Sequence, residues 1–155
     1  MRGTIIIDFD DTLFDCEAFK KDLDVKQCAR HLFPDARDFL MRMKSAGFFI
    51  VLLSRGEVDF QQSKFVVCGI DALVDQIIVG PEPKPELAAR VPPVGAVFFI
   101  NDKIDETRDV IAQFSVFQPI LKRRPDVPAD QYRLLHIPSF DTLTEIVDYI
   151  YAQKS

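Results

Sequence analysis

The chain has 155 residues, a length that fits one domain with its own hydrophobic core. Hydrophobic residues make up 48% and charged residues 28%, without any low-complexity tract, which excludes a disordered or fibrous protein. The net charge of −5 disfavours bulk attraction to nucleic acid or to an anionic membrane. The first apolar run, Ile5–Ile7, is too short for a signal peptide or a membrane span, so we expect a cytoplasmic protein without membrane association.

Apolar β-favouring runs alternate along the chain with segments of helical periodicity. In chain order, the expected elements are a strand at Thr4–Phe9, a helix between Cys16 and Leu32, a helix at Asp35–Ala46, a strand at Phe48–Leu53, a helix at Val58–Cys68, a strand at Gln76–Val79, a helix at Pro85–Arg90, a strand at Val94–Ile100, a helix at Asp105–Phe114, strands at Ser115–Ile120 and near Tyr132–Ile137, and a helix at Phe140–Ala152. Such alternation predicts parallel strands joined by crossover helices. We therefore expect a three-layer, Rossmann-like α/β domain, in which helices flank a central parallel sheet of about five or six strands.

Acidic residues follow two of these strands. Asp8 and Asp10 end the first strand and point to the same side, because strand side chains alternate. By itself this pair is equally typical of a polar turn, but Asp102 directly follows the strand that ends at Ile100. In open α/β sheets, ligands bind at the carboxyl ends of the strands. Three carboxylates that meet there require a cation, and hard oxygen ligands favour Mg²⁺.

Groups that suit a phosphate lie at the same predicted edge. Ser54 and Arg55 follow the second strand, where a hydroxyl and free backbone N–H groups suit a phosphate oxygen. Lys84 lies in the proline-dense segment Pro81–Pro93, which leads to the fourth strand. A lone serine is usually structural and a lone loop lysine is usually solvated, but a cation aimed at an acidic pocket that holds a metal would bind a phosphoryl group.

Taken together, these motifs resemble those of the haloacid dehalogenase superfamily. The segment Asp8–Leu13, which reads DFDDTL, is similar to its first motif, DxDx[TV]L. Ser54 resembles the second motif, Lys84 with Pro85 the third, and Asn101–Glu106 the acidic fourth. Each motif is weak alone, but the four stand in the order and spacing of that superfamily. The resemblance extends from about Thr4 to Phe114.

The resemblance implies a Mg²⁺-dependent phosphohydrolase that forms an aspartyl-phosphate intermediate on Asp8. Asp10 would be the acid that protonates the leaving oxygen and later the base that activates water. The residues implied to bind the phosphoryl oxygens are Ser54, Arg55 and Lys84. The implied metal ligands are Asp8, the backbone carbonyl of Asp10, and Asp102. The substrate would be a phosphorylated small molecule or macromolecule, which the sequence does not name.

The fourth motif departs from the family pattern. Asn101 stands where Gly or Asp is usual, and Glu106 stands where the second acid is expected, with Asp105 one residue earlier. Both Asp105 and Glu106 are therefore candidates to orient the water ligands of the metal. The departure keeps open an alternative function, a catalytically weak or inactive phosphate-binding or scaffold protein. Retention of Asp8 and Asp10 disfavours it, because Asp10 is needed for turnover and not for binding.

A signalling receiver domain also gathers acids, a hydroxyl and a lysine around Mg²⁺ and accepts a phosphoryl group on an aspartate. Its acceptor aspartate ends the third strand, however, whereas the third apolar run here, Gln76–Val79, ends at Gly80 and Pro81. We therefore do not favour this interpretation.

No large cap domain is expected. Only about forty residues separate Asp10 from Ser54, and about thirty separate Ser54 from Lys84. We expect one domain over residues 1–155, with a flap over about 13–33. A capless protein of this family would accept large substrates or close its site by forming a homo-oligomer. Phe14 and Phe19 in the flap either contact a substrate or another subunit, or pack locally.

A basic run follows the fifth strand and should emerge at the same edge as the acidic residues. It consists of Lys122, Arg123 and Arg124. The run either attracts an anionic substrate or forms a solvated loop.

Overall fold

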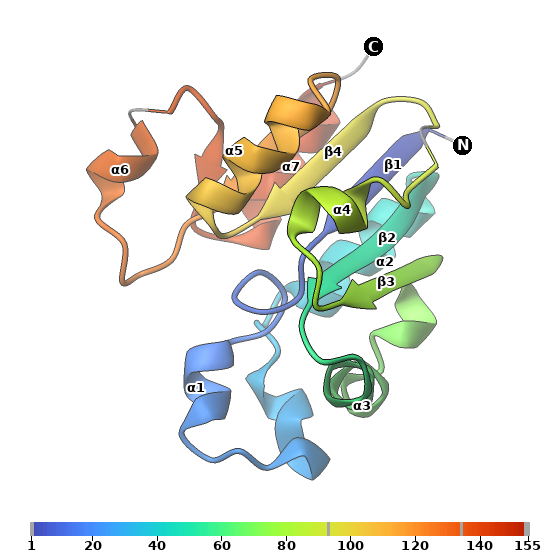
Figure 1. Cartoon of the computed structure of the whole chain (residues 1–155), viewed down its shortest axis with the longest axis vertical. Coiled ribbons are helices and arrows are strands. Elements are labelled where there is room, and N and C mark those ends of the chain that lie inside the picture. Colours follow the sequence, from blue (N-terminus) through green and yellow to red (C-terminus); the bar gives the residue numbers. More distant parts are fainter. Residues whose placement is uncertain (1, 93, 134, 154–155) are drawn as a thin grey trace.

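The computed structural model describes residues 2–92, 94–133 and 135–153. Its centre is a parallel sheet with the strand order β3-β2-β1-β4-β5-β6 (Figure 1). The strands are β1 (Gly3–Ile7), β2 (Phe48–Arg55), β3 (Gln76–Gly80), β4 (Val97–Asn101), β5 (Gln118–Lys122) and β6 (Ser139–Phe140). The predicted α/β fold with a central parallel sheet is confirmed.

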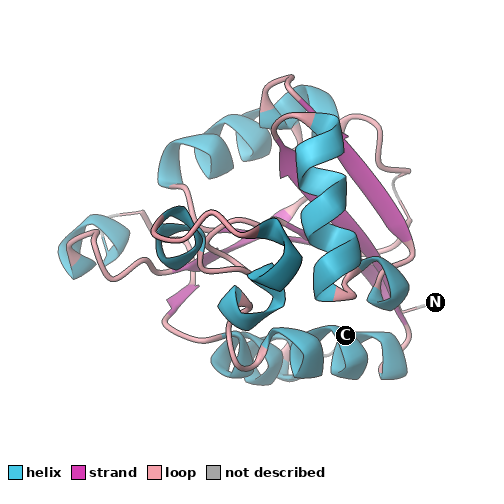
Figure 2. Cartoon of the chain, turned by 90° about the horizontal axis from the view of Figure 1, so that it is seen from below, coloured by secondary structure: helices cyan, strands magenta, loops and turns pink. Residues whose placement is uncertain are grey.

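Helices cover both faces of the sheet (Figure 2). They are α1 (Cys16–Lys20), η1 (Val25–His31), α2 (Ala36–Ser45), α3 (Val58–Cys68), η2 (Asp71–Leu73), α4 (Lys84–Ala88), α5 (Ile104–Gln113), α6 (Ala129–Arg133) and α7 (Leu143–Ala152), where η marks a 3₁₀ helix. Because neighbouring strand residues face opposite sides, Ile5 and Ile7 of β1 pack with α2 and α7, whereas Ile6 packs with α4 and α5. Two hydrophobic cores thus hold the three layers together. Within the described residues, no helix is both long and apolar enough to cross a bilayer.

Helix α3 begins and ends at the predicted residues. At its start, the side chain of Glu57 accepts hydrogen bonds from the backbone N–H groups of Asp59 and Phe60. At its end, Gly69 has a φ of 70°, the left-handed conformation that glycine adopts without strain. Helix α3 matters for function because it faces the residues that follow β1.

The predicted strand at Tyr132–Ile137 is wrong. Its first two residues belong to α6, and Leu134 lies outside the described residues. The last strand is instead β6, and α7 begins at Leu143 rather than at Phe140. A short apolar run does not distinguish a strand from a helix, and Pro128 directly before α6 suits the start of a helix. The single helix predicted between Cys16 and Leu32 is found as two short helices, α1 and η1, and the other predicted elements are found with bounds that shift by a few residues.

The segment predicted as a flap forms α1 and η1. These lie beside α3 at the edge of the sheet where the parallel strands end (Figure 1). Phe14 and Phe19 are buried there, so the interpretation that they pack locally is confirmed. Helix α6 lies apart from them, beyond the end of β5 (Figure 1). Near this edge, the described part of the chain therefore contains the flap, formed by α1 and η1, and helix α6, but no large cap domain.

Candidate active site

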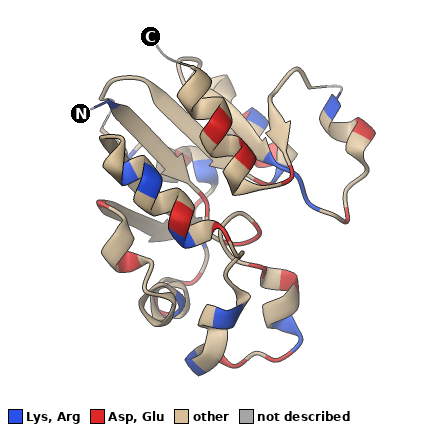
Figure 3. Cartoon of the chain, turned by 180° about the vertical axis from the view of Figure 1, so that it is seen from behind, with Lys and Arg blue, Asp and Glu red and all other residues tan. Residues whose placement is uncertain are grey.

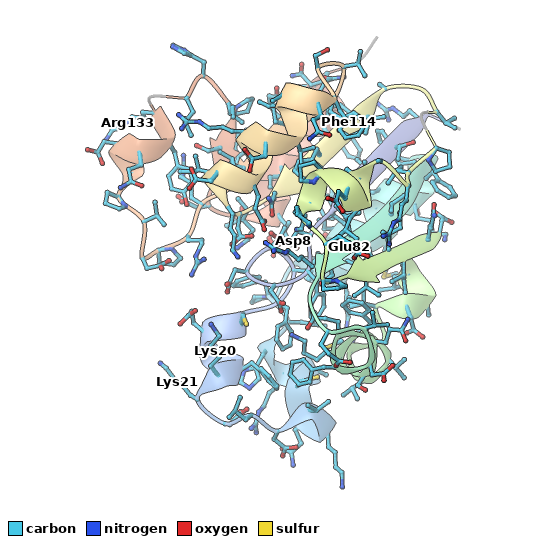
Figure 4. All side chains as sticks on the ribbon, in the orientation of Figure 1. Asp8, Lys20, Lys21, Glu82, Phe114 and Arg133 are labelled. Carbon is cyan, nitrogen blue, oxygen red and sulfur yellow. The ribbon has the colours of Figure 1, made fainter. Side chains whose placement is uncertain are left out.

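The acidic residues lie at the point of the sheet where the direction in which successive strands are added reverses. After β1 the chain builds β2 and β3 on one side and then crosses to β4 on the other. Asp8 follows β1 and Asp102 follows β4, and these two strands are neighbours. Such a switch point leaves a crevice at the carboxyl ends of the strands. In Figure 4, Asp8 lies near the centre of the view, Lys20 and Lys21 lie at the end of α1 and just after it, and Arg133 ends α6.

Asp8 contacts a buried lysine. The Nζ atom of Lys84 lies 2.6 Å from Oδ1 of Asp8, and Lys84 is only 2% exposed. Burial alone would lower the pKa of Lys84, but the carboxylates of Asp8, Glu106 and Asp102 outweigh it and raise the pKa above its ordinary value. Lys84 is therefore a cation held against Asp8, at the start of α4.

Asp102 lies beside Asp8 and is 2% exposed. The hydroxyl of Thr12 lies 3.4 Å from Oδ2 of Asp8 and 3.4 Å from Oδ1 of Asp102, so it links the two carboxylates. Burial, and then the nearby charge of Asp8, raise the pKa of Asp102 to about 9. Its Oδ2 atom is buried and has no hydrogen-bond partner among the described residues. A carboxylate oxygen that accepts no hydrogen bond and lies next to a second carboxylate fits a hard divalent cation.

The expected convergence of three carboxylates is not found. Asp10 turns toward α3, where Lys64 Nζ lies 2.9 Å from its Oδ1 and Gln61 Nε2 donates to its Oδ2 at 3.0 Å. In the part of the chain that the structure describes, no three acidic, histidine or cysteine side chains are grouped so as to hold a metal. The reason is electrostatic, because the ammonium of Lys64 draws Asp10 away from Asp8 and Asp102. Only the backbone of Asp10 remains as the third ligand that the resemblance implies.

Two of the predicted phosphate-binding residues, Arg55 and Lys84, line one cleft with Asp8, whereas Ser54 is not part of its wall. The volume of the cleft is about 290 Å³, and its walls include Asp8, Asp10, Arg55, Lys84 and Glu106. Ser54 is buried, and its hydroxyl accepts a hydrogen bond of 2.6 Å from Gln61. Arg55 is exposed, and its Nε donates to the backbone carbonyl of Pro81.

The structure distinguishes the two candidate acids of the fourth motif. Glu106 lines the cleft, where its Oε1 lies 3.8 Å from Lys84 Nζ and accepts a hydrogen bond of 3.4 Å from Asn101. Asp105 is exposed and is absent from this cleft; it lines an adjoining hollow between α5 and α6 that Glu106 also lines. Of the two, Glu106 faces Asp8. Asn101 itself is buried and also contacts Thr107, so it joins the end of β4 to the first turn of α5.

The three residues of the basic run line one hollow together with Phe33 and Asp126, but their side chains have different partners. Lys122 ends β5 and is buried with its Nζ 3.6 Å from the ring centre of Phe33, so a solvated loop is wrong for this residue. Arg123 turns away and pairs with Asp141 at 2.9 Å. Only Arg124 reaches the site, where its Nη1 lies 3.5 Å from Oδ2 of Asp102. Figure 3 likewise shows acidic and basic positions interspersed over the ribbon.

Sequence reasoning missed three residues that contact the candidate site: Thr12, Gln61 and Lys64. Thr12 is part of the first motif, but its bridging position between Asp8 and Asp102 depends on the pairing of β1 with β4. Gln61 and Lys64 are three residues apart on α3, which places them on one side of the helix. That spacing was the only signal in the sequence, because their partner Asp10 lies more than fifty residues away.

This fold is that of the haloacid dehalogenase-like hydrolases. A haloacid dehalogenase-like hydrolase from Burkholderia xenovorans matches with a TM-score of 0.79 and 15% identity over 96% of each chain. D,D-heptose 1,7-bisphosphate phosphatase from B. bronchiseptica, complexed with magnesium and phosphate, matches with a TM-score of 0.68 and 15% identity over 99% of this chain and 100% of that one.

The L-2-haloacid dehalogenase from Xanthobacter autotrophicus, with chloropropionic acid covalently bound, also matches, with a TM-score of 0.68, 14% identity and coverage of 99% of this chain and 100% of that one. No protein-family model and no curated protein sequence matches this chain. The structural matches confirm the predicted resemblance at the level of the fold. Since they include both a phosphatase and a dehalogenase, the reaction has to be argued from the site.

Proposed function

We propose that this protein is a Mg²⁺-dependent phosphohydrolase that acts through an aspartyl-phosphate intermediate on Asp8. The observation that carries the proposal is the presence of Asp10 beside the cleft, two residues after Asp8. A departing alkoxide needs a proton, whereas a departing halide does not. A second acid at this place therefore favours cleavage of a phosphate ester over dehalogenation.

The donor set supports a magnesium ion. Asp8, Asp102 and the backbone carbonyl of Asp10 would hold it; among the described residues Oδ2 of Asp102 accepts no hydrogen bond, and its ion-pair partner is Arg124 at 3.5 Å. When bound, Mg²⁺ would neutralise the charge of the two carboxylates and of the phosphate dianion. The phosphatase from B. bronchiseptica with the same fold is complexed with magnesium and phosphate.

The side chains of the cleft suit the two steps of phosphate transfer. Lys84, Ser54 and Arg55 bind the phosphoryl oxygens, and an Oδ atom of Asp8 attacks phosphorus while the bond to the leaving oxygen breaks. For this step Asp10 must be in its carboxylic acid form; it gives its proton to that oxygen and is left as the carboxylate that pairs with Lys64. In the second step Asp10 takes a proton from water, which attacks phosphorus, releases inorganic phosphate and restores the Asp8 carboxylate.

The substrate we propose is a phosphorylated small molecule or macromolecule. The open cleft and the lack of a large cap among the described residues support access for large substrates. A homo-oligomer that covers the cleft remains part of the proposal.

The experiment that tests this function measures phosphate release from an aryl phosphate with Mg²⁺, and then with excess EDTA. We expect turnover that EDTA abolishes and that Asp8→Asn abolishes together with covalent phosphorylation. Activity that persists in EDTA would refute the metal assignment. If Asp8→Asn still incorporates acid-stable, hydroxylamine-sensitive phosphate, the nucleophile lies elsewhere.

A second candidate function is phosphate binding without turnover. The observation that favours it is the guanidinium of Arg124, which lies 3.5 Å from Asp102 and supplies positive charge where a metal would. Such a protein would bind inorganic phosphate equally well with and without Mg²⁺ and would form no phosphoenzyme.

A further inference from the structure

Helix α3 carries a lysine in an unusual environment. Lys64 is 2% exposed, and its Nζ lies between 5.0 and 5.5 Å from the centres of four aromatic rings. The rings belong to Phe9, Phe14, Phe19 and Phe60. Together the four rings form an aromatic cage around Nζ. Two of these phenylalanines come from the flap and one from α3 itself, so the cage forms only when the flap packs against α3.

A buried ammonium is costly unless an anion compensates for its lost hydration. The ring faces attract a cation and supply part of this compensation. Among the described residues, the one carboxylate within 4 Å of Lys64 Nζ is Asp10, at 2.9 Å. Since the cage surrounds the rest of the ammonium, Lys64 has a single strong partner and is held in one orientation.

Gln61 is the second residue that fixes the position of the Asp10 carboxylate. Its Nε2 donates to Oδ2 of Asp10, whereas Lys64 contacts Oδ1, so each carboxylate oxygen has its own donor. Two donors on two oxygens set the plane of the carboxylate as well as its direction. The same Nε2 atom donates to the hydroxyl of Ser54, which ties the proposed acid to a proposed phosphate-binding residue. Asp10 nevertheless stays 31% exposed at the cleft, within reach of a bound ester.

We propose that Lys64, supported by Gln61, is the positioning residue that holds Asp10 ready for proton transfer. This inference rests on the proposed phosphohydrolase function and deepens it. Lys64 touches neither Asp8 nor the cleft, so it acts on the reaction only through Asp10. The flap contributes through Phe14 and Phe19, which complete the cage.

The test replaces Lys64 by methionine, which keeps a long side chain and removes the charge. If Asp10 is misplaced, kcat for an alkyl phosphate should fall about 10²-fold, with little change in KM. An aryl phosphate with a good leaving group should still phosphorylate Asp8, but phosphoenzyme should accumulate because activation of water also needs Asp10. Lys44→Met is the matched control, because it removes a Lys–Asp pair of the same 2.9 Å length near the opposite edge of the sheet.

A double variant separates positioning from a general structural role. In an Asp10→Asn background, Lys64→Met should cause no further loss of turnover, because the group through which Lys64 acts is already gone. Equal losses for every leaving group, without trapped phosphoenzyme, would overturn the proposal. If Lys64→Met does not fold, Gln61→Leu provides the same test and should give the same dependence on leaving group.

The proposed function and this inference fail in different ways. A wild-type protein without Mg²⁺-dependent turnover would refute the proposed function, and the positioning role of Lys64 would be refuted with it. A wild-type protein that turns over, together with a Lys64→Met variant that behaves like Lys44→Met, refutes the inference alone.

Discussion

Asp8 and Asp10 stand two residues apart but have different surroundings. Asp8 is buried against Lys84 and shares Thr12 with Asp102. Asp10 is partly exposed and faces α3 instead. Alternation along the strand explains why both carboxylates reach the same edge, and the separate lysines explain how they are kept apart. This division suits a nucleophile and a separate acid.

Asp10→Asn should slow substrates with poor leaving groups by about 10²–10⁴-fold, the usual contribution of general acid catalysis. Substrates with good leaving groups should lose much less in the first step, and the variant should accumulate phosphoenzyme. Burst kinetics followed by a slow steady state would be the signature. Asp38→Asn, an exposed change on α2, is the control. A loss that is equal for all leaving groups, without trapped phosphoenzyme, would mean that Asp10 serves metal binding or folding.

Magnesium affinity should depend on pH through Asp102. Burial and the charge of Asp8 raise the pKa of Asp102 from 3.8 to about 9, so the metal-free protein keeps this proton at neutral pH. Because the pKa of Asp102 is higher in the folded than in the unfolded chain, Asp102 contributes most to the free energy of unfolding below pH 3.8, where both states hold the proton. This contribution decreases as the pH rises and is lost once the pH passes about 9. Mg²⁺ competes with the proton, so its affinity should increase with pH up to about 9 and its binding should release protons.

Isothermal titration with MgCl₂ in buffers of different ionisation enthalpy measures both the affinity and the proton release. Asp102→Asn should bind Mg²⁺ weakly at every pH. An affinity in the wild type that is independent of pH between neutrality and pH 9 would contradict this account of Asp102.

At the scale of elements, the three basic residues at the end of β5 and directly after it have different partners. Arg124 is the one that contacts Asp102, so Arg124→Ala should raise KM for a polyanionic substrate in a salt-dependent way. Arg123→Ala is the matched control, because it removes a similar charge that pairs with Asp141 instead. An unchanged KM for Arg124→Ala at low salt would show that Arg124 does not bind substrate.

Helix α3 depends on the left-handed conformation at its end. Gly69→Ala should lower the free energy of unfolding by about 1–2 kcal/mol, because a Cβ atom is strained at positive φ. The added methyl group would also lie 3.2 Å from Arg37 Nη1. Urea denaturation measures the change, with Val66→Ala, an exposed position of α3, as the control. A stability equal to that of the wild type would mean that the end of α3 rearranges freely.

At the scale of the whole molecule, the strand order brings the site together. Because β1 lies between β2 and β4, the residues that follow these three strands meet at one edge. The flap packs on α3 beside this edge, and α6 lies farther along it, beyond β5 (Figure 1). The two cores on either face hold the strands in register, so the geometry of the site depends on packing throughout the domain.

Much of this arrangement follows from the sequence alone. Buried apolar runs and helical periodicity predict the strands β1 to β5 and the bounds of α3, because both patterns are local. The places of Asp8 and Asp102 directly after neighbouring strands, and of Ser54 near the end of β2, also follow, since parallel strands all end at the same edge. The prediction of a strand at Tyr132–Ile137 was wrong because the apolar residues of this segment suit a helix as well as a strand.

The tertiary structure alone decided how the charged side chains are paired. Asp10 contacts Lys64, Glu106 rather than Asp105 faces Lys84, and only Arg124 of the basic run reaches Asp102. These choices depend on contacts between residues that are far apart in the chain, where periodicity carries no information. A buried charged group pairs with an opposite charge that the packing of the fold places close to it. The sequence therefore determined which ionisable groups lie at this edge of the sheet, and the tertiary structure determined which of them form pairs.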